Sequence, residues 1–383
     1  MTSRLIYLDN AATSFPKPKA VTDEVALCVE QYCGNPGRGS HPLAMASADG
    51  IFECRSALAS FLGADDPANV IFSLNTTYAI NLLLKGILKQ GDHVIISDLE
   101  HNSVFRPIYK MATAGMIEYD VFPSMCVLPS ATPSRICAGI AKRLRPNTKM
   151  VICTHQSNIC SYNLPLAHIG AFCHRHGLLF AVDGAQSAGH LPLNMKDMCI
   201  DALAVPSHKG LLGIQGAGAL ILSKSLPLDT LVEGGNGLYS LEGDMSDMPP
   251  ERYESGTLPT PAIVGLLRGI QAVSKMGVEQ IGQHDQALFY QARERLETFK
   301  SITLYASQSP GSTLLFGADG IPSEKLAHIL GQKGICVRGG HHCSALGHKT
   351  LGTPPDGAVR ISFGVYNTTR DLDALVDALR EIL

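Results

Sequence analysis

The stretch LLFAVDGAQSAG, residues 178–189, decides the fold class. It begins with an uninterrupted apolar run, continues with one aspartate, Asp183, and ends in a turn of small residues. An apolar run this short, bounded by turn residues, predicts a strand that is buried on both faces. The stretch therefore predicts a buried strand with an ionisable group at its carboxyl end.

The same pattern recurs along much of the chain. Segments of helical length separate the runs, and strands that alternate with helices predict βαβ units, hence a mostly parallel sheet covered on both faces. Polar stretches follow the strand ends, where an open α/β sheet places its binding site. The other runs are NVIFS (69–73), HVIIS (93–97), KMVICT (149–154), IDALAV (200–205) and GALILS (218–223), and the polar stretches are SLNTTYAIN, DLEHNS, THQSN, DGAQSAG and PSHKGLLG.

The pattern changes near residue 262, where long amphipathic helical stretches precede a small α/β unit. We predict two domains from this change. Residues 16–261 form a large domain with the mostly parallel sheet, and residues 1–15 and 262–383 form a smaller α/β domain.

Composition excludes several classes of protein. The chain has 383 residues, 45% hydrophobic and 17% charged, with a net charge of −3, so we expect a globular protein without the basic face of a nucleic-acid binder. No apolar run reaches the roughly 20 residues that span a bilayer, and the N-terminus lacks the apolar core of a signal peptide. The eleven cysteines include no CxxC pair. We therefore expect no membrane partner, a cytoplasmic location and reduced thiols.

Lys209 and Asp183 suggest cofactor chemistry. Lys209 lies among small and apolar residues after a predicted strand, where desolvation would lower the pKa of its amine and make it a nucleophile toward aldehydes. Pyridoxal phosphate (PLP) requires such a lysine, and a buried carboxylate such as Asp183 suits its pyridinium nitrogen. Two plainer interpretations stay open, a solvated surface lysine and an Asp183 that only caps a helix.

Other polar residues fit an anionic cofactor and an amino-acid substrate. Asn75, Thr76 and Thr77 precede a helical run and form either an anion site or a simple helix cap. His155 follows a strand end, where it would either stack on a planar ring or be structural. Arg360 lies within a predicted strand and would either grip a carboxylate with two hydrogen bonds or form an internal salt bridge.

Cys343 is a metal ligand, a buried thiol or a nucleophile. It stands in RGGHHCSALGHKTLG (338–352), where two histidines directly precede it. These three side chains are too close in sequence to converge easily on one tetrahedral ion, and no second ligand group stands at a zinc-motif spacing. We therefore predict no metal site, here or at CHRH (173–176).

Taken together, seven motifs resemble those of class V aminotransferase-fold PLP enzymes, specifically the cysteine desulfurase and selenocysteine lyase branch. The resemblance runs in order from about residue 5 to residue 383. It implies a PLP-dependent transferase of fold type I, with PLP as cofactor. The motifs are YLDNAATSFPKP, HQSN, VDGAQSAGHLPL, SHKGLLG, ERYESGT, GHHCSALGHKTLGT and VRISFGVYNT.

The resemblance also implies a role for each matching residue. Lys209 would hold PLP covalently and Cys343 would be the sulfur acceptor, and together with His155 they form the catalytic set. Substrate-binding residues would be Arg38, Asn158 and Arg360, of which Asn158 and Arg360 would hold the substrate carboxylate. The other cofactor contacts would be Asp183 on the pyridine nitrogen, Gln186 on the ring hydroxyl, His155 on the ring face, Thr76, Thr77, Ser207 and His208 on the phosphate, and Thr257 from the second subunit of a homodimer.

The implied reaction converts L-cysteine to L-alanine and leaves a persulfide on Cys343, which passes its sulfur to an acceptor or scaffold protein. His341 and His342 would lower the pKa of the Cys343 thiol if one of them is protonated. Two alternatives remain, a selenocysteine lyase or other PLP-dependent C–S or C–Se lyase acting on L-selenocysteine, and a non-catalytic binding protein with the same fold.

The chain departs from the family pattern near the expected cofactor. Pro206 and Ser207 replace residues that usually contact phosphate or are glycine, ICSYNLP (159–165) replaces a small turn, and Asn236 replaces a common threonine. These departures bear on the phosphate contacts and on the shape of the substrate pocket.

Overall fold

The computed structural model describes residues 5–37, 39–124, 126, 131–223, 226–237 and 240–383. Its larger sheet has seven strands in the order β2-β8-β7-β6-β5-β3-β4. Neighbours from β7 to β4 are parallel, whereas β8 is antiparallel to both β7 and β2. The predicted mostly parallel sheet is therefore confirmed. The strands are β2 (Val70–Ser73), β3 (His93–Ser97), β4 (Glu118–Phe122), β5 (Thr148–Thr154), β6 (Leu179–Asp183), β7 (Ala202–Pro206) and β8 (Gly218–Leu222).

Strand β4 was not predicted from the sequence. Its sequence, EYDVF, has no apolar run, and most of its side chains are partly exposed because the strand lies at the edge of the sheet. Its pairing with β3, not its own sequence pattern, identifies it as a strand.

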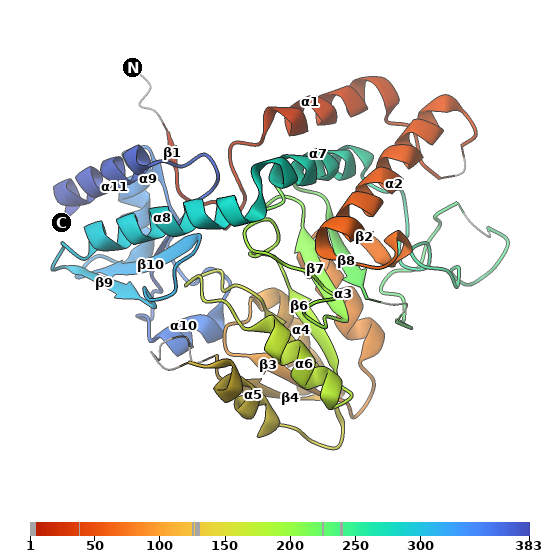
Figure 1. The fold of residues 1–383 in the computed structure, drawn as a ribbon, viewed down its shortest axis with the longest axis horizontal. Coiled ribbons are helices and arrows are strands. Elements are labelled where there is room, and N and C mark those ends of the chain that lie inside the picture. The colour runs from red at the N-terminus through yellow and green to blue at the C-terminus, as the bar shows by residue number, and fades with distance from the viewer. Residues whose placement is uncertain (1–4, 38, 125, 127–130, 224–225, 238–239) are drawn as a thin grey trace.

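Helices cover both faces of this sheet, as Figure 1 shows. Successive side chains of β5 alternate between two apolar cores: Val151 and Cys153 pack on one side, and Met150 and Ile152 on the other. The first core also takes residues from α2 (Pro42–Leu62), α5 (Pro133–Ala141), α6 (Leu166–Arg175) and α7 (Thr260–Met276), and the second from α3 (Thr76–Ile87) and α4 (Asn102–Thr113).

A second α/β unit lies beside the large sheet and is drawn in blue in Figure 1. Its antiparallel sheet has the order β12-β10-β9, and helices α8, α9 and α11 share its apolar core. The elements are α8 (Val278–Leu296), β9 (Ile302–Tyr305), β10 (Thr313–Ala318), α9 (Ser323–Gln332), β11 (Ile335–Cys336), α10 (Ala345–Leu351), β12 (Val359–Ser362) and α11 (Thr369–Ile382), with β1 (Ile6–Tyr7) paired to β11. The remaining helices are α1 (Lys19–Leu27), the π-helical turn η1 (Cys28–Tyr32) and the 3₁₀ turn η2 (Pro67–Asn69).

Helix α7 packs with the large sheet. Its side chains Ile263, Leu266 and Ile270 belong to the core that α2 also shares. The division of the chain at residue 262 remains a prediction, and this packing favours a boundary after α7, near Gly277.

An N-terminal arm, residues 8–17, joins the two units. The amide of Ala11 donates to Ser362 Oγ at 2.9 Å in the small unit. Three residues later, the amide of Ser14 donates to the carbonyl of His208 at 3.0 Å in the large unit. None of the helices in the described part of the chain has the length and apolar character needed to cross a bilayer.

Candidate active site

The polar residues predicted at the strand ends lie side by side. Asp183 is the last residue of β6, His155 directly follows β5, and Lys209 follows β7. These strands are parallel neighbours in register, with Thr154 opposite Asp183 and Asp183 opposite Ala204. The amide of His155 donates to the Asp183 carbonyl at 3.0 Å. The sheet thus brings together residues separated by more than fifty positions in the chain.

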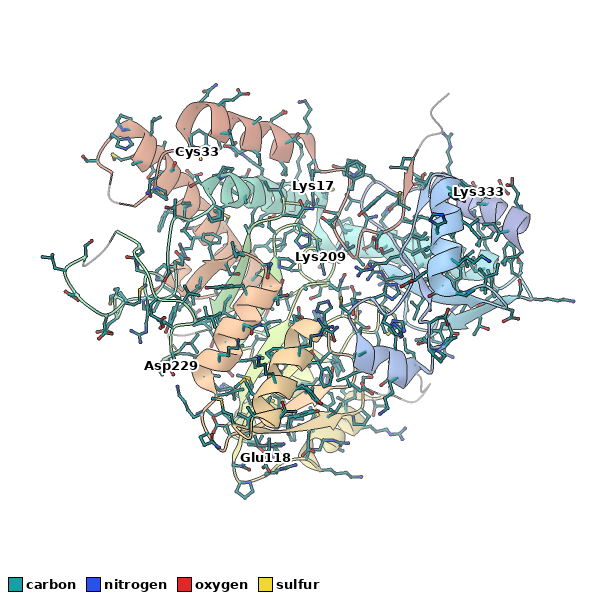
Figure 2. The ribbon with its side chains drawn as sticks, turned by 180° about the vertical axis from the view of Figure 1, so that it is seen from behind. Lys17, Cys33, Glu118, Lys209, Asp229 and Lys333 are labelled. Atoms are coloured by element: carbon teal, nitrogen blue, oxygen red, sulfur yellow. The ribbon has the colours of Figure 1, made fainter. Side chains whose placement is uncertain are left out.

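Lys209 is a buried amine suited to nucleophilic attack. Burial lowers the pKa of its amine to about 8, with the Asp183 carboxylate acting against this change. At that pKa a substantial fraction of the amine is neutral near neutral pH, as attack on an aldehyde requires. Figure 2 shows Lys209 near the middle of the molecule, whereas Glu118 and Lys333 lie at its margins.

Asp183 is almost completely buried, with 2% of its surface exposed. Burial raises the pKa of its carboxyl, and the Ala185 amide (2.9 Å), the charge of Lys209 and the Ser103 hydroxyl (3.3 Å) oppose that rise. A cationic ring nitrogen placed against this carboxylate would favour its ionised form further.

The start of α3 and the two residues before Lys209 supply hydrogen-bonding atoms that have no partner within the protein. Asn75 caps the helix by accepting from the Tyr78 amide at 2.9 Å. The buried atoms Thr76 Oγ1, Ser207 Oγ and His208 Nδ1 lack hydrogen-bond partners. Buried polar groups are normally paired, so these three atoms fit an external acceptor such as a phosphate. Thr77, in contrast, is exposed.

The loop that carries Lys209 leaves little room beside these donors. A Cβ atom at Gly213 would lie 2.1 Å from Ser207 Oγ, and one at Gly218 would lie 2.9 Å from the Cα of Asn75. Glycine at both positions lets the backbone approach the donors closely. The residues present therefore fit PLP, with Lys209 for its aldehyde, Asp183 for its ring nitrogen and these donors for its phosphate.

The N-terminal arm closes over the same loop. Gln186, the predicted contact of the ring hydroxyl, is held by the arm, because its Nε2 donates to the Ala11 carbonyl at 3.0 Å. Lys17 Nζ donates to the carbonyl of His208 at 2.8 Å and to Ser14 Oγ at 2.7 Å. Burial lowers the pKa of Lys17 to about 8. Lys17 thus binds the residue that directly precedes Lys209, and Figure 2 labels both lysines.

Two buried histidines flank the centre. Burial lowers the pKa of His155 to about 4, and its Nδ1 has no partner. Burial also lowers the pKa of His101 to about 4, and the charges of Lys209, Arg338, Arg360 and Arg106 lower it further. Both rings are therefore neutral at neutral pH, and both are candidates for the face of a planar ring.

Three further residues belong to this site but were not predicted from the sequence, namely Glu100, His101 and Ser103. All lie in DLEHNS, which the sequence alone identifies only as a polar stretch after a strand. His101 Nδ1 accepts from the Ser103 amide at 3.0 Å and so begins α4. The position of the stretch after β3 was the available signal, but nothing in it distinguished a helix cap from a site residue.

Glu100 is a fully buried carboxyl behind Asp183. Its Oε1 accepts from the Thr154 amide at 3.0 Å and from the Ser97 hydroxyl, while its Oε2 has no partner. Burial, together with the nearby Asp183 charge, raises the pKa of Glu100 to about 8, although both hydrogen bonds oppose the rise. Glu100 is therefore largely protonated at neutral pH.

Arg360 and Asn158 meet at the small unit. Arg360 is 1% exposed, and its Nη1 donates to the Asn158 carbonyl at 3.1 Å. Its Nη2 pairs with Asp9 at 2.7 Å, so the internal salt bridge is present, yet Nε has no partner. This free edge is where a substrate carboxylate can bind. Arg38, the third predicted substrate-binding residue, lies outside the described residues.

The segment that contains Cys343 lies at the mouth of the site. Cys343 is exposed, and both it and His342 have positive φ angles, 56° and 52°. Its carbonyl accepts from the Asn102 amide at 2.7 Å, and Asn158 Nδ2 donates to the His342 carbonyl at 2.8 Å. Two hydrogen bonds to backbone carbonyls therefore hold the segment, while Cys343 itself is exposed.

His342 does not supply the positive charge that would favour a thiolate. Its ring is buried and stacks on His348, and its Nε2 bonds to the Arg338 carbonyl at 3.0 Å. Burial holds the pKa of His342 far below its usual range, so the ring is neutral and the predicted contribution from this histidine is wrong. Within the described residues, no group of three His, Cys, Asp or Glu side chains is placed to hold a metal ion.

Thr257 lies apart from Lys209 within this chain. It is exposed and lines a cavity of about 640 Å³ together with Asn35, Gly37, Asn236 and Glu254. None of the strand-end residues lines this cavity. A single chain therefore does not bring Thr257 to the candidate site.

Comparison with known proteins identifies the family. The profile of class V aminotransferases matches residues 6–375. The chain belongs to this family. It is 31% identical over 99% of its length to a "Probable cysteine desulfurase" of Halalkalibacterium halodurans, covering 93% of that protein. It is 30% identical over 98% of its length to a protein of the same name from Methanothermobacter thermautotrophicus, covering 94% of it.

Solved structures of this family confirm the fold. The apo structure of a cysteine desulfurase from Thermococcus onnurineus superposes with a TM-score of 0.88 at 29% identity, covering 99% of this chain and 94% of that one. A cysteine desulfurase from Escherichia coli gives a TM-score of 0.87 at 26% identity, covering 98% and 94%. The predicted fold class, α/β with a mostly parallel sheet and a smaller α/β unit, is thus confirmed as that of the family.

Proposed function

We propose that this protein is a PLP-dependent cysteine desulfurase that converts L-cysteine to L-alanine and carries the sulfur as a persulfide on Cys343. One observation carries the proposal. The first turn of α4 contacts both halves of the chemistry, because Asn102 donates to the Cys343 carbonyl and Ser103 donates to Asp183. An exposed thiol and a buried carboxylate suited to a pyridinium ring are thus held by one helix end.

PLP, when bound, supplies an electron sink that weakens bonds at the substrate carbons. The protein contributes the rest. Lys209 would provide the amine that holds the cofactor, since its lowered pKa keeps part of it neutral. Asp183 would favour positive charge at the ring nitrogen. His155 and His101, both neutral, lie where a ring face can stack or a proton can move.

Substrate position comes from the small unit. The unpartnered Nε of Arg360 takes the α-carboxylate, while its Nη1 stays bound to the Asn158 carbonyl. Cys343, as its thiolate, then takes the sulfur atom of L-cysteine: a new S–S bond forms at the Cys343 sulfur and the substrate C–S bond breaks. The electron pair of the broken bond stays on the substrate side, and the β-carbon takes up a proton to become the methyl group of L-alanine. Because the thiol is exposed, its cargo can pass to an acceptor or scaffold protein.

We further propose a homodimer in which Thr257 reaches the partner's phosphate site. Its exposure beside the 640 Å³ cavity supports this arrangement. So do the exposed apolar side chains of the neighbouring elements, Val29, Leu43, Met45 and Phe52. Sedimentation is expected to give twice the chain mass, and a stable, fully active monomer would contradict the shared site. The cytoplasmic location stays a prediction.

The direct test is the absorbance spectrum of the purified protein, followed by product analysis with L-cysteine and L-selenocysteine. A PLP band and equimolar alanine and persulfide from L-cysteine are expected. Alanine from L-selenocysteine alone would make the protein a selenocysteine lyase. Without a PLP band after incubation with the cofactor, the protein would be a non-catalytic member of the fold.

A further inference from the structure

The surroundings of Cys343 carry more positive charge than the chain as a whole. The net charge is −3, yet two exposed arginines, Arg106 and Arg338, flank the Cys343 segment. Neither makes an ion pair in the part of the chain that the structure describes. Unpaired surface arginines next to an exposed functional thiol require an explanation, because arginine is the side chain best suited to bind carboxylates.

Arg106 lies one helical turn from the contact between α4 and the Cys343 segment. The Asn102 amide donates to the Cys343 carbonyl, and Arg106 lies four residues later, on the same face of α4 and one turn away. Side chains of a helix lean toward its N-terminus, so Arg106 leans back toward Cys343.

Arg338 approaches from the opposite side. Its backbone pairs with that of Arg360, with the Arg360 amide donating to the Arg338 carbonyl at 2.8 Å. The same carbonyl accepts from His342, next to Cys343. The charges of both arginines also lower the pKa of His101, the residue at the start of α4. Glu324, which lies near Gly340, pairs with neither arginine.

We propose that Arg106 and Arg338 form a docking rim for a protein whose acceptor cysteine is flanked by carboxylates. This proposal rests on the desulfurase function proposed above. It commits to a protein because Cys343 lies exposed at the surface, and none of the cavities described contains it. Charge complementarity at such a rim acts mainly on encounter and on the choice of partner.

The transfer itself needs no oxidant. The acceptor thiolate attacks the terminal sulfur of the Cys343 persulfide, a new S–S bond forms, and the old S–S bond breaks. Its electron pair leaves on the Cys343 thiolate, and the proton stays on the transferred sulfur. The two arginines hold the acceptor's carboxylates while its thiol is in line with the persulfide.

The test measures sulfur transfer from the holoenzyme to three synthetic peptides, in which one cysteine is flanked by two glutamates, two glutamines or two lysines. The enzyme is loaded with L-cysteine, freed of excess substrate and mixed with each peptide below saturation. We expect the order glutamate, glutamine, lysine, with the differences shrinking at about 1 M salt, where charges are screened within about 3 Å.

The variant Arg106→Gln distinguishes an effect of the docking rim from differences in thiol reactivity between the peptides. Variant and wild type are compared on the same peptide, so the reactivity of its thiol is constant. Transfer to the glutamate peptide is expected to fall about two- to fivefold, the effect of one exposed charge pair. Transfer to the glutamine peptide is expected to stay the same. Lys110→Gln, an exposed cation one turn further along α4, is the matched control and is expected to change nothing.

Equal wild-type rates for the three peptides would overturn the proposal, as would an Arg106→Gln loss that is equal for all of them. Before any peptide is added, mass spectrometry of the enzyme fragment that contains Cys343 shows whether the persulfide is present. A wild-type enzyme without a persulfide at that stage contradicts the proposed desulfurase function itself, which distinguishes that failure from a failure of the docking rim.

Discussion

The strand-end centre and the Cys343 segment belong to one site but differ in their exposure to solvent. At the strand ends, Lys209 and Asp183 sit in the protein interior, and burial changes the pKa of each side chain. Cys343 is exposed, and the bonds that hold its segment go to backbone atoms, not to the thiol. Cofactor chemistry here therefore depends on burial of Lys209 and Asp183 away from water, whereas sulfur transfer depends on the access of an acceptor to Cys343.

The largest effect is expected at the buried centre. Lys209→Ala removes the amine that would hold PLP, and activity should fall by three or more orders of magnitude, on the order seen when a covalent catalytic group is lost. Borohydride reduction of the wild-type holoenzyme and peptide mapping identify the modified lysine. Lys17→Ala is the matched control, because burial also lowers the pKa of Lys17 to about 8. A label on Lys17, or on any other lysine, would refute the assignment.

At the exposed segment, Cys343→Ala should separate transfer from cofactor binding. PLP content and its absorbance are expected to stay near wild type, because no cofactor residue changes, while alanine formation from L-cysteine falls at least about a hundredfold. With L-selenocysteine a substantial rate should remain, since the weaker C–Se bond needs less help from a nucleophile. Cys33→Ala, which removes another exposed thiol, is the control.

Retention of full activity by Cys343→Ala would make another cysteine the acceptor. Cys160 follows HQSN in the sequence and is the nearest alternative there, but it is 1% exposed. A buried thiol cannot present sulfur to an acceptor protein. Loss of PLP from the variant would instead make Cys343 structural.

A smaller effect concerns Glu100, which lies between the two regions. Its pKa in the folded protein, about 8, exceeds its ordinary value of 4.5, so its stabilising contribution is full below about pH 4.5 and is lost as the pH rises through about 8. Glu100→Gln mimics the protonated carboxyl without this dependence. We expect equal stability near pH 4.5. At pH 8 to 9 we expect the variant to be more stable by a few kcal/mol, because each tenfold difference in proton affinity between the folded and unfolded states corresponds to roughly 1.4 kcal/mol.

Chemical denaturation across this pH range measures the difference. Glu53→Gln, at an exposed position, is the control and should show no trend. A stability difference between wild type and Glu100→Gln that does not change with pH would mean that Glu100 is ionised in the folded protein.

The smallest expected effect is at the phosphate donors. Thr76 Oγ1 is buried and has no partner in the protein, so Thr76→Val should leave the apoprotein at least as stable as wild type, because no hydrogen bond is lost. Affinity for PLP should fall about tenfold, the loss of one hydrogen bond to a charged group. Titration of the apoenzyme with PLP measures it. Thr77→Val tests the other predicted donor, and a loss confined to Thr76 would assign the contact to the buried hydroxyl.

The sequence by itself determined the fold class and most of the buried centre. Short apolar runs such as LLFAVD record burial on both faces, and their alternation with helices leaves few topologies other than a mostly parallel sheet. Lys209, Asp183 and His155 were predictable because the carboxyl ends of parallel strands share one edge. These are properties of local periodicity and chain order, which a sequence displays directly.

Only the tertiary structure decided the rest. The edge strand β4, the packing of α7 and the site residues Glu100 and His101 carry no distinctive local pattern. Nor does the sequence show that Asn102 holds Cys343, a contact between positions far apart in the chain. Charge states also depended on the fold: His341 or His342 was expected to lower the pKa of the Cys343 thiol if one of them is protonated, and burial keeps the His342 ring neutral. The pKa of a side chain depends on how much water the fold removes and which charges it brings near, and neither quantity is a property of neighbouring residues in the sequence.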